Sequence, residues 1–271
     1  MTEGATNSMG AGEIPGIDTA VPHTARVWNY WLGGKDNYLA DRELGDQIVK
    51  VFPAIVDVAR HSRAFLRRAV RYLAEEAGVR QYLDIGTGLP TADNTHEVVQ
   101  RIAPDSRVVY VDNDPLVLVH ARALLAGTPQ GVVDYLDADV REPKAILEHA
   151  ARILDFGRPV ALMLLGVMEH IEDDEQAYAI VRELVDGLPS GSYLVLNDAT
   201  PSPEREEALR LCRESGSECI VPRTPEQIAR FFEGLELLPP GVVSASRWRA
   251  EQTPFGEPPE VETYCGVARK P

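Results

Sequence analysis

The stretch Arg80–Asn94, RQYLDIGTGLPTADN, decides the fold of this 271-residue chain. Its apolar run suits a buried strand that reaches Asp84, and the Gly-Thr-Gly that follows breaks this strand. Pro90 suits the first turn of a helix. The stretch therefore predicts a strand, a tight loop and a helix start. In an open parallel sheet such a loop lies where ligands bind, and glycines let the backbone approach them closely.

The two glycines, Gly86 and Gly88, are a weak indicator of the cofactor when they are considered alone. The dinucleotide-binding pattern G-x-G-x-x-G requires a third glycine at position 91, which is Thr91 in this chain. A nicotinamide-dependent oxidoreductase is therefore the less favoured alternative among enzymes.

A second strand is predicted at Arg107–Val111 because β-branched residues dominate it, and Asp112 follows directly. A carboxylate at this place can accept two hydrogen bonds from the vicinal hydroxyls of a ribose. The alternative role for Asp112 is a turn or a helix cap. Asp114 and Pro115 already suit the N-cap and the first helical residue, which favours the ribose role for Asp112.

Three segments together resemble a known family. They are the D-x-G-x-G loop, PHTARVWNYWLGGKDNY at residues 22–38 and VYVDNDP at residues 109–115. The chain is similar, from about Thr19 to its C-terminus, to the actinobacterial S-adenosyl methyltransferase family, first described as a domain of unknown function. It departs from the usual motif at Pro90, where a small residue is expected.

The resemblance implies an α/β fold of the Rossmann-like class I methyltransferase type. We expect a sheet of about seven strands, mostly parallel, with helices on both faces and an N-terminal helical cap. The implied cofactor is S-adenosyl-L-methionine, and no metal is required. The expected divisions are a flexible tail at residues 1–18, a helical cap or lid at 19–56 and the cofactor-binding domain at 57–271.

The resemblance also assigns cofactor contacts along the sheet. A third strand, Val132–Val140, ends in D-A-D-V, and its acid would approach the adenine amine; Asp137 is the alternative to Asp139 and could equally be solvated. The predicted cofactor-binding residues along the sheet are Asp84, Gly86, Thr87, Gly88, Asp112, Asn113, Asp139, Val140 and Gly166.

The most hydrophobic strand, Pro159–Met168, is expected at the centre of the sheet, buried on both faces. His170 follows it, at the edge where the methyl group and its acceptor should meet. A histidine there could act as a general base if the acceptor needs deprotonation, or it could be structural. Further strands are predicted at Gly191–Asn197, Leu235–Leu238, Gly241–Trp248 and Val261–Ala268.

The N-terminal segment concentrates aromatic side chains, Trp28, Tyr30 and Trp31, in a short predicted helix that Gly33-Gly34 should end. These rings either dock a small cap on the domain or close the cofactor pocket. The polar loop behind them is either a plain turn or a binding loop that supplies Asp36 and Tyr38 to the site.

The helix predicted at Asp57–Ala77 carries five arginines, most of which should be solvated. One of them could meet the methionine carboxylate of the cofactor, and Arg63 is the preferred candidate.

Composition limits the remaining possibilities. The formal net charge of -15 disfavours nucleic acids as substrates. The three cysteines lack metal or disulfide spacing, and the longest apolar run is shorter than the roughly 18 residues of a membrane helix. We therefore expect a cytoplasmic enzyme with a small-molecule acceptor, no nucleic-acid partner and no membrane contact. The sequence leaves the oligomeric state, the acceptor and a non-catalytic, cofactor-binding alternative open.

Overall fold

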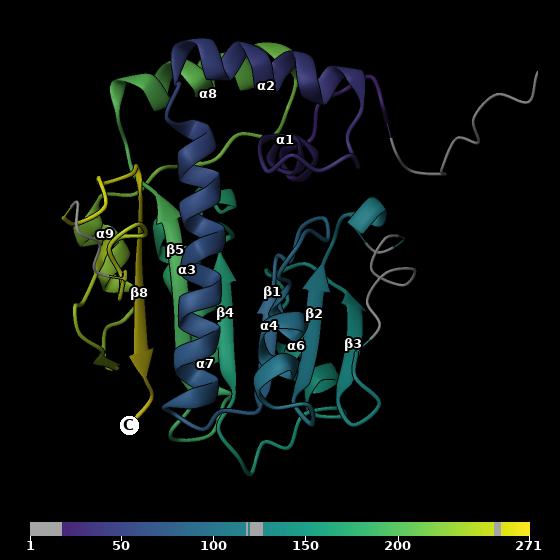
Figure 1. Ribbon diagram of the computed structural model, residues 1–271, viewed down its shortest axis with the longest axis vertical. Helices are drawn as coiled ribbons and strands as arrows, with labels where there is room; N and C mark the ends of the chain where they lie inside the picture. The colour runs from purple at the N-terminus through teal and green to yellow at the C-terminus, as the bar shows by residue number, and fades with distance from the viewer. Residues whose placement is uncertain (1–17, 118, 120–126, 252–255) are drawn as a thin grey trace, which may run out of the picture.

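The computed structural model describes residues 18–117, 119, 127–251 and 256–271. They form one eight-stranded sheet in the order β3-β2-β1-β4-β5-β8-β6, with β7 paired to β8 (Figure 1). The strands β1 to β5 are parallel, whereas β8 runs antiparallel to β5, and β6 and β7 run antiparallel to β8. The strands are β1 Gln81–Ile85, β2 Arg107–Asp112, β3 Val132–Asp137, β4 Ala161–Leu165, β5 Tyr193–Ala199, β6 Glu236–Leu237, β7 Val243–Ser244 and β8 Thr263–Arg269.

Helices cover both faces of the sheet and also its upper edge (Figure 1). One face is covered by α3 (Ile55–Glu75) and α4 (Thr95–Ile102), and the other by α6 (Pro143–Ala150), α7 (Asp174–Asp186) and α9 (Pro225–Arg230). The helices α1 (Thr24–Trp31), α2 (Leu39–Val51) and α8 (Pro203–Ser215) form a separate layer over the carboxyl ends of the parallel strands. The expected α/β class, with a mostly parallel sheet and helices on both faces, is confirmed, and the sheet has an antiparallel end at β8.

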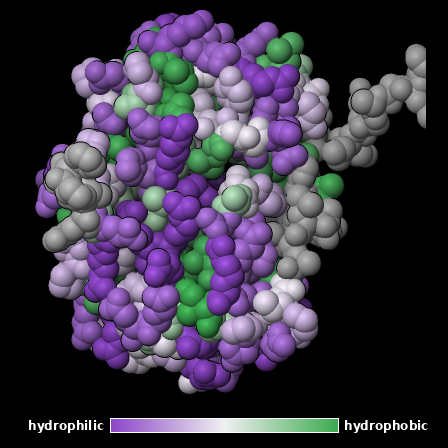
Figure 2. Space-filling model, in the orientation of Figure 1, coloured by the Kyte–Doolittle hydropathy of each residue, from purple (hydrophilic) through white to green (hydrophobic). Residues whose placement is uncertain are grey.

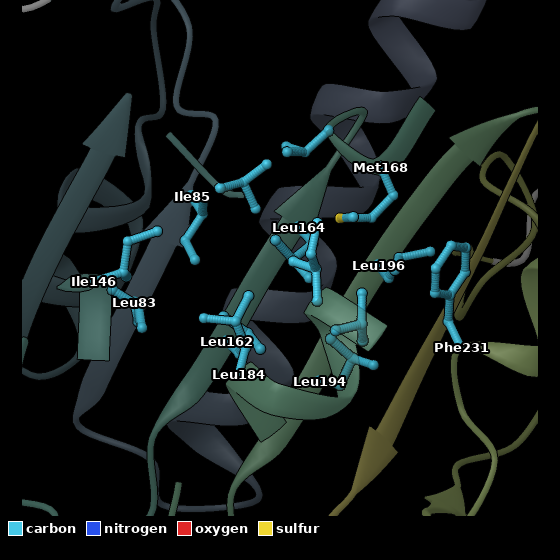
Figure 3. Close-up of a cluster of buried hydrophobic side chains, with 14 of the residues drawn as sticks. Leu83, Ile85, Ile146, Leu162, Leu164, Met168, Leu184, Leu194, Leu196 and Phe231 are labelled. Carbon is cyan, nitrogen blue, oxygen red and sulfur yellow. The ribbon is translucent and has the colours of Figure 1, made fainter. Parts of the chain in front are cut away.

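The core follows the two-residue period of the strands. In β4, Leu162 and Leu164 face the helices α6 and α7, whereas Ala161 and Met163 face α3. Figure 3 shows the hydrophobic cluster on the α6 and α7 side of the sheet, in which leucines of β1, β4 and β5 pack together with Ile146 of α6. The strand β4 lies between β1 and β5, so the prediction that it is central and buried on both faces is confirmed.

The predicted helix start at Pro90 is wrong, because α4 begins at Thr95. Asn94 and Glu97 form a capping box in which the Asn94 N–H donates to the Glu97 carboxylate at 2.9 Å. Asp93 has a left-handed backbone with φ of 62°, so it belongs to the turn before the helix. The glycine loop therefore continues to Asn94, which lengthens the backbone available at the ends of the strands.

Several strand boundaries also differ from the predictions. The third strand ends at Asp137 because the chain turns after Ala138, where the Glu142 N–H donates to the Asp139 carbonyl oxygen. The fourth strand ends at Leu165, since Gly166 has φ of 68°, and a 3₁₀ turn, η1, follows at Met168–His170. Only Val243–Ser244 of the predicted strand Gly241–Trp248 pairs with β8.

A buried arginine fixes η1 to the end of β5. The Arg223 side chain is fully buried and donates hydrogen bonds to the carbonyl oxygens of Met168 and Ile171, each at 2.7 Å. It also pairs with the carboxylates of Asp198 and Asp174, each at 3.0 Å. Burial raises the pKa of Asp198, as does the charge of Glu169, and Arg223 opposes both effects.

We expect Arg223→Met to lower the free energy of unfolding by roughly 3 to 5 kcal/mol, because it leaves the buried Asp198 carboxylate without its cation. Urea unfolding followed by circular dichroism measures this change. The control is Arg60→Met, since Arg60 forms an exposed pair with Asp57 and its loss should cost no more than about 0.5 kcal/mol. Equal effects of the two changes would contradict this role for Arg223.

The outer surface over α3 is mainly hydrophilic, with hydrophobic side chains in small separate patches (Figure 2). None of the helices in the described part of the chain is long and apolar enough to cross a membrane. The predicted flexible tail, residues 1–18, lies outside the described residues except for Asp18.

Candidate functional site

A cavity of about 1030 Å³ lies between the carboxyl ends of β1, β2, β4 and β5 and the layer of α1, α2 and α8. Its volume is at the upper end of the roughly 300–1,000 Å³ that is usual for small-molecule sites. The cavity brings together most of the predicted site residues. Those that line it are Arg63, Asp84, Gly86, Thr87, Gly88, Asp112, Asn113, Asp139, Val140, Gly166 and His170.

The glycine loop has the conformation that its sequence requires. Gly86 and Gly88 have φ of 69° and 64°, a region that other residues rarely adopt. The Gly86 N–H donates to the Val111 carbonyl oxygen at 2.8 Å, and Thr87 also contacts this oxygen through its hydroxyl group at 3.3 Å. A Cβ atom on Gly88 would meet nothing within 4 Å, so the loop leaves open space on its cavity side.

Asp112 closes the loop against the end of β2. Its carboxylate accepts the Gly88 N–H at 2.8 Å and the Asp114 N–H at 3.0 Å. Burial raises the pKa of Asp112, and these backbone hydrogen bonds oppose the rise. Each carboxylate oxygen has a second lone pair, so Asp112 can still accept bonds from a ligand. Asp114 caps the next helical turn, accepting the Leu116 N–H at 2.8 Å, as its sequence predicts.

Asp84 and Arg63 lie beneath the loop. The Thr95 hydroxyl donates to the Asp84 carboxylate at 2.6 Å, and Arg63 donates through Nη2 to the Ala92 carbonyl oxygen at 3.2 Å. Burial lowers the pKa of Arg63, an effect that the negative charge of Asp84 opposes. The Nε and Nη1 atoms of Arg63 donate to none of the described residues, so the guanidinium can still bind an anion.

Burial raises the pKa of Asp84 to about 6, although the Thr95 hydroxyl and the charge of Arg63 lower it. Unfolding returns this carboxyl to a pKa of about 3.9, so the folded state binds its proton more tightly. We compare the free energy of unfolding of the wild type with that of Asp84→Asn. The wild-type value should fall relative to the variant's by up to about 3 kcal/mol as the pH rises from 4 to 7. Urea unfolding of both proteins across this range measures the difference. A difference in the free energy of unfolding that is independent of pH would contradict the raised pKa of Asp84.

The next polar group lies at the end of β3. Asn113 donates to the Asp139 carboxylate at 3.3 Å, and Arg141 forms an ion pair with it at 2.9 Å. Val140 is buried beside them, whereas Asp137 is exposed and outside the cavity lining. The geometry thus favours Asp139 over Asp137 as the acid that faces a ligand.

The end of β4 contributes the turn at Gly166 and the adjacent η1. The Gly166 N–H donates to the Asn197 carbonyl oxygen at 2.9 Å. His170 lines the cavity through η1, and its carbonyl oxygen accepts a hydrogen bond from Arg141 at 3.3 Å. Glu169 also lines the cavity, and its carboxylate accepts the Ala199 N–H at 2.7 Å.

The N-terminal loop residues lie elsewhere. Asp36 and Tyr38 are half-buried and do not line the cavity. The Asn29 side chain organises this loop, since its Oδ1 atom accepts the Asp36 N–H at 3.1 Å and the Asn37 side chain at 3.0 Å. Tyr38 precedes α2 as its N-cap and packs against the cluster of Leu89, Leu116 and Val117. Asp36 and Tyr38 thus lie apart from the predicted residues that line the cavity.

Other N-terminal residues do reach the cavity. Trp28 and Trp31 line it and pack edge to face, with ring centroids 6.1 Å apart. His23 also lines it, and its Nδ1 atom lies 3.3 Å from the Asp114 carboxylate. The aromatic residues therefore both dock the N-terminal helices and wall the cavity.

Sequence reasoning did not identify the contributions of Glu169 and Arg205. Arg205 lies in the first turn of α8 and reaches the cavity because α8 packs beside α2, far from it in sequence. In the Glu-His pair after the fourth strand, only His170 was predicted to be a site residue. No local pattern marked Arg205 as an inward-facing residue.

The family model for the S-adenosyl methyltransferases matches residues 11–271. The chain belongs to this family. It is thus an S-adenosylmethionine-dependent methyltransferase, and the predicted cofactor, S-adenosylmethionine, is confirmed.

Solved structures agree with membership in the S-adenosyl methyltransferase family. A DUF574 family protein from Streptomyces avermitilis is 42% identical, with a TM-score of 0.89 over 94% of this chain and 99% of that one. A candidate methyltransferase from Thermobifida fusca is 43% identical, with a TM-score of 0.85 over 94% and 97%. No curated protein matches this chain.

A more distant structure shows the fold alone. It is a SAM-dependent methyltransferase from Archaeoglobus fulgidus, which is 15% identical with a TM-score of 0.50 over 77% of this chain and 94% of that one.

The residues present fit the cofactor of the S-adenosyl methyltransferase family. The open space beside Gly88 admits a ligand close to the backbone. The Thr91 hydroxyl is buried, lines the cavity and has no hydrogen-bond partner among the described residues. A nucleoside can supply hydrogen bonds to such groups, whereas the third glycine of a dinucleotide site is absent.

Proposed function

We propose that this methyltransferase acts on a small-molecule acceptor, which binds between the strand ends and the layer of α1, α2 and α8. The observation that carries the proposal is the extent of the cavity. It continues from the glycine loop and Asp112 to a wall formed by Trp28, Trp31 and Ala208. This second part offers a space for an acceptor next to the predicted cofactor site.

The cofactor part of the cavity divides into three groups of contacts. We assign Asp112 to the ribose hydroxyls, because its carboxylate is fixed by two backbone N–H groups. We assign Asn113, Asp139 and Val140 to the adenine side. Arg63 is assigned to the methionine carboxylate, since two of its nitrogen atoms donate to none of the described residues.

S-adenosylmethionine supplies an electrophilic methyl group, and the displaced C–S bond leaves its electron pair on sulfur. The protein then mainly has to align the acceptor for in-line attack. Gly166 and His170 follow the central strand and line the cavity. We assign to His170 the role of accepting a proton from an N–H or O–H acceptor.

The helices over the cavity and the charge of the chain favour a small acceptor over a macromolecule. Helices α1, α2 and α8 cover the strand ends, and the net charge of -15 disfavours a nucleic acid.

All three cysteines are free thiols, which is the state expected in a reducing cytoplasm.

We also propose that residues 19–56 act as a cap that walls the cavity. Arg26, nearly fully buried, pairs with the Asp41 carboxylate at 3.0 Å and thereby ties α1 to α2. Residues of α2 and Ala208 of α8 belong to one hydrophobic cluster. This packing supports a cap whose helices are held together over the strand ends.

A labelled transfer experiment tests the proposed function. The protein is incubated with S-adenosylmethionine carrying an isotopic methyl group and with a metabolite extract, and the products are separated by mass. The proposal expects label in a low-mass product, and this product should be lost with Asp112→Ala. Label found only in protein or nucleic acid would contradict the small-molecule assignment.

A further inference from the structure

Arg205 is a buried cation in the wall of the cavity. It follows Ser202, the N-cap of α8, by three positions, and its neighbours Glu204 and Glu206 are exposed. Arg205 itself is only 5% exposed, and it lines the cavity. The first turn of α8 therefore directs its acids to solvent and its arginine inward.

Neutral groups hold this guanidinium in place. Its Nε atom donates to the Thr200 carbonyl oxygen at 2.9 Å, and Nη2 donates to the Glu262 carbonyl oxygen at 2.7 Å. The group also lies over the Phe52 ring, 5.2 Å from its centroid. Nη1 donates to none of the residues that the structure describes.

Arg205 forms no ion pair within the described part of the chain, although carboxylates lie in its surroundings. Glu169 and Glu262 are near enough for their charges to raise its pKa, whereas burial lowers it. The carboxylate of Glu169 is instead held on β5, where it accepts the Ala199 N–H. A buried cation without a paired anion is unfavourable, and the positive end of the α8 dipole adds to this cost.

On the side of Phe52, the surroundings of Arg205 are apolar. Phe52, beneath its guanidinium, belongs to a cluster with Leu44, Ile48 and Ala208, and Trp28 and Trp31 pack against this cluster. All of these residues except Phe52 also line the cavity. A ligand that fills the space beside this cluster can therefore present an apolar body to the cluster and one anionic group to Arg205.

We propose that Arg205 binds a carboxylate of the methyl acceptor, so that the acceptor is a small carboxylic acid with an apolar or aromatic body. This inference rests on the proposed function, since it names the acceptor class for the same cavity. A carboxylate can accept a hydrogen bond from Nη1 and compensate the buried charge, which a neutral ligand cannot do. Arg205 is thus a substrate-binding residue and takes no part in proton transfer.

Binding of aromatic carboxylates tests this inference without requiring turnover. Benzoate, phenylacetate, 3-phenylpropionate and indole-3-acetate are titrated, each beside its uncharged amide, into the protein saturated with S-adenosylhomocysteine. The variants are Arg205→Gln, which removes the charge, and Arg205→Lys, which keeps it. Arg210→Gln is the matched control, because Arg210 lies on the same helix outside the cavity lining and pairs with Glu207 at 2.7 Å.

We expect at least one carboxylate to bind the wild type at least about tenfold more tightly than its amide. Arg205→Gln should abolish this preference, Arg205→Lys should keep part of it, and Arg210→Gln should keep all of it. Unchanged binding of S-adenosylhomocysteine and an unchanged circular dichroism spectrum show that the variants are folded. Equal binding of acids and amides by the wild type, or a preference that survives in Arg205→Gln, would overturn the inference.

The two proposals fail separately. If labelled methyl groups enter a small molecule that has no carboxylate, the proposed function stands and the role of Arg205 is wrong. If carboxylates bind through Arg205 but no methyl group is transferred to any small molecule, the binding site stands and the proposed acceptor class loses its basis.

Discussion

Gly86→Val is expected to weaken the binding of S-adenosylmethionine by at least about a hundredfold. A Cβ atom at this position would lie 2.3 Å from Cγ2 of Val167, so either the glycine loop or the turn after β4 must move. Both segments wall the cavity. A side chain at a φ of 69° also strains the backbone by roughly 1 to 2 kcal/mol.

Gly78→Val is the control that separates the steric clash of Gly86→Val from its backbone strain. Gly78 has φ of 70°, a Cβ atom there would meet nothing within 4 Å, and the residue does not line the cavity. Both variants should therefore lose stability through backbone strain, but only Gly86→Val should lose the cofactor. Calorimetric titration with S-adenosylhomocysteine checks this, and unaltered affinity in a folded Gly86→Val protein would show that the loop is not part of the site.

Asp112→Ala is expected to have the second large effect. Hydrogen bonds from ribose hydroxyls to this carboxylate are worth roughly 1.5 to 3 kcal/mol each, so the loss of two weakens binding by a hundredfold or more, to order of magnitude. The change also removes the acceptor for the Gly88 N–H. We therefore expect a modest fall in melting temperature together with the loss of affinity.

Asp137→Ala is the matched control for Asp112→Ala. Asp137 is the direct partner of Asp112 in the register between β2 and β3, but it is exposed and does not line the cavity. Its removal should leave both affinity and stability nearly unchanged. If the two alanine variants bind the cofactor equally well, the ribose site lies elsewhere.

The parts of the fold that could be predicted from the sequence are those that local patterns determine. The central strand reads as an uninterrupted apolar run because both of its faces are buried. The T-x-x-Q pattern at Thr224 and Gln227 is typical of a capping box, and the structure has one there, with reciprocal bonds of 3.3 and 2.8 Å. Asp112 could be placed at the site because a strand ends there and a second acid caps the following turn.

The parts that could not be predicted depend on contacts between distant segments. Pro90 satisfies the rule for a first helical residue, but the capping box at Asn94 competes with it and determines where α4 begins. Asp36 and Tyr38 form a polar loop, and only the structure shows that Asn29 binds it from inside. Arg205 reaches the cavity through the packing of α8 beside α2, which no local pattern encodes.

The most direct test of the central claim, that the cavity above β1 and β2 holds S-adenosylmethionine, is calorimetric titration of the purified wild-type protein with three ligands. We expect heat of binding from S-adenosylmethionine and from S-adenosylhomocysteine, none from NAD, and the loss of both sulfur-ligand signals in Gly86→Val. The glycine loop without a third glycine, together with Asp112, supports this order of preference. Binding of NAD with no heat from either sulfur ligand would contradict the account.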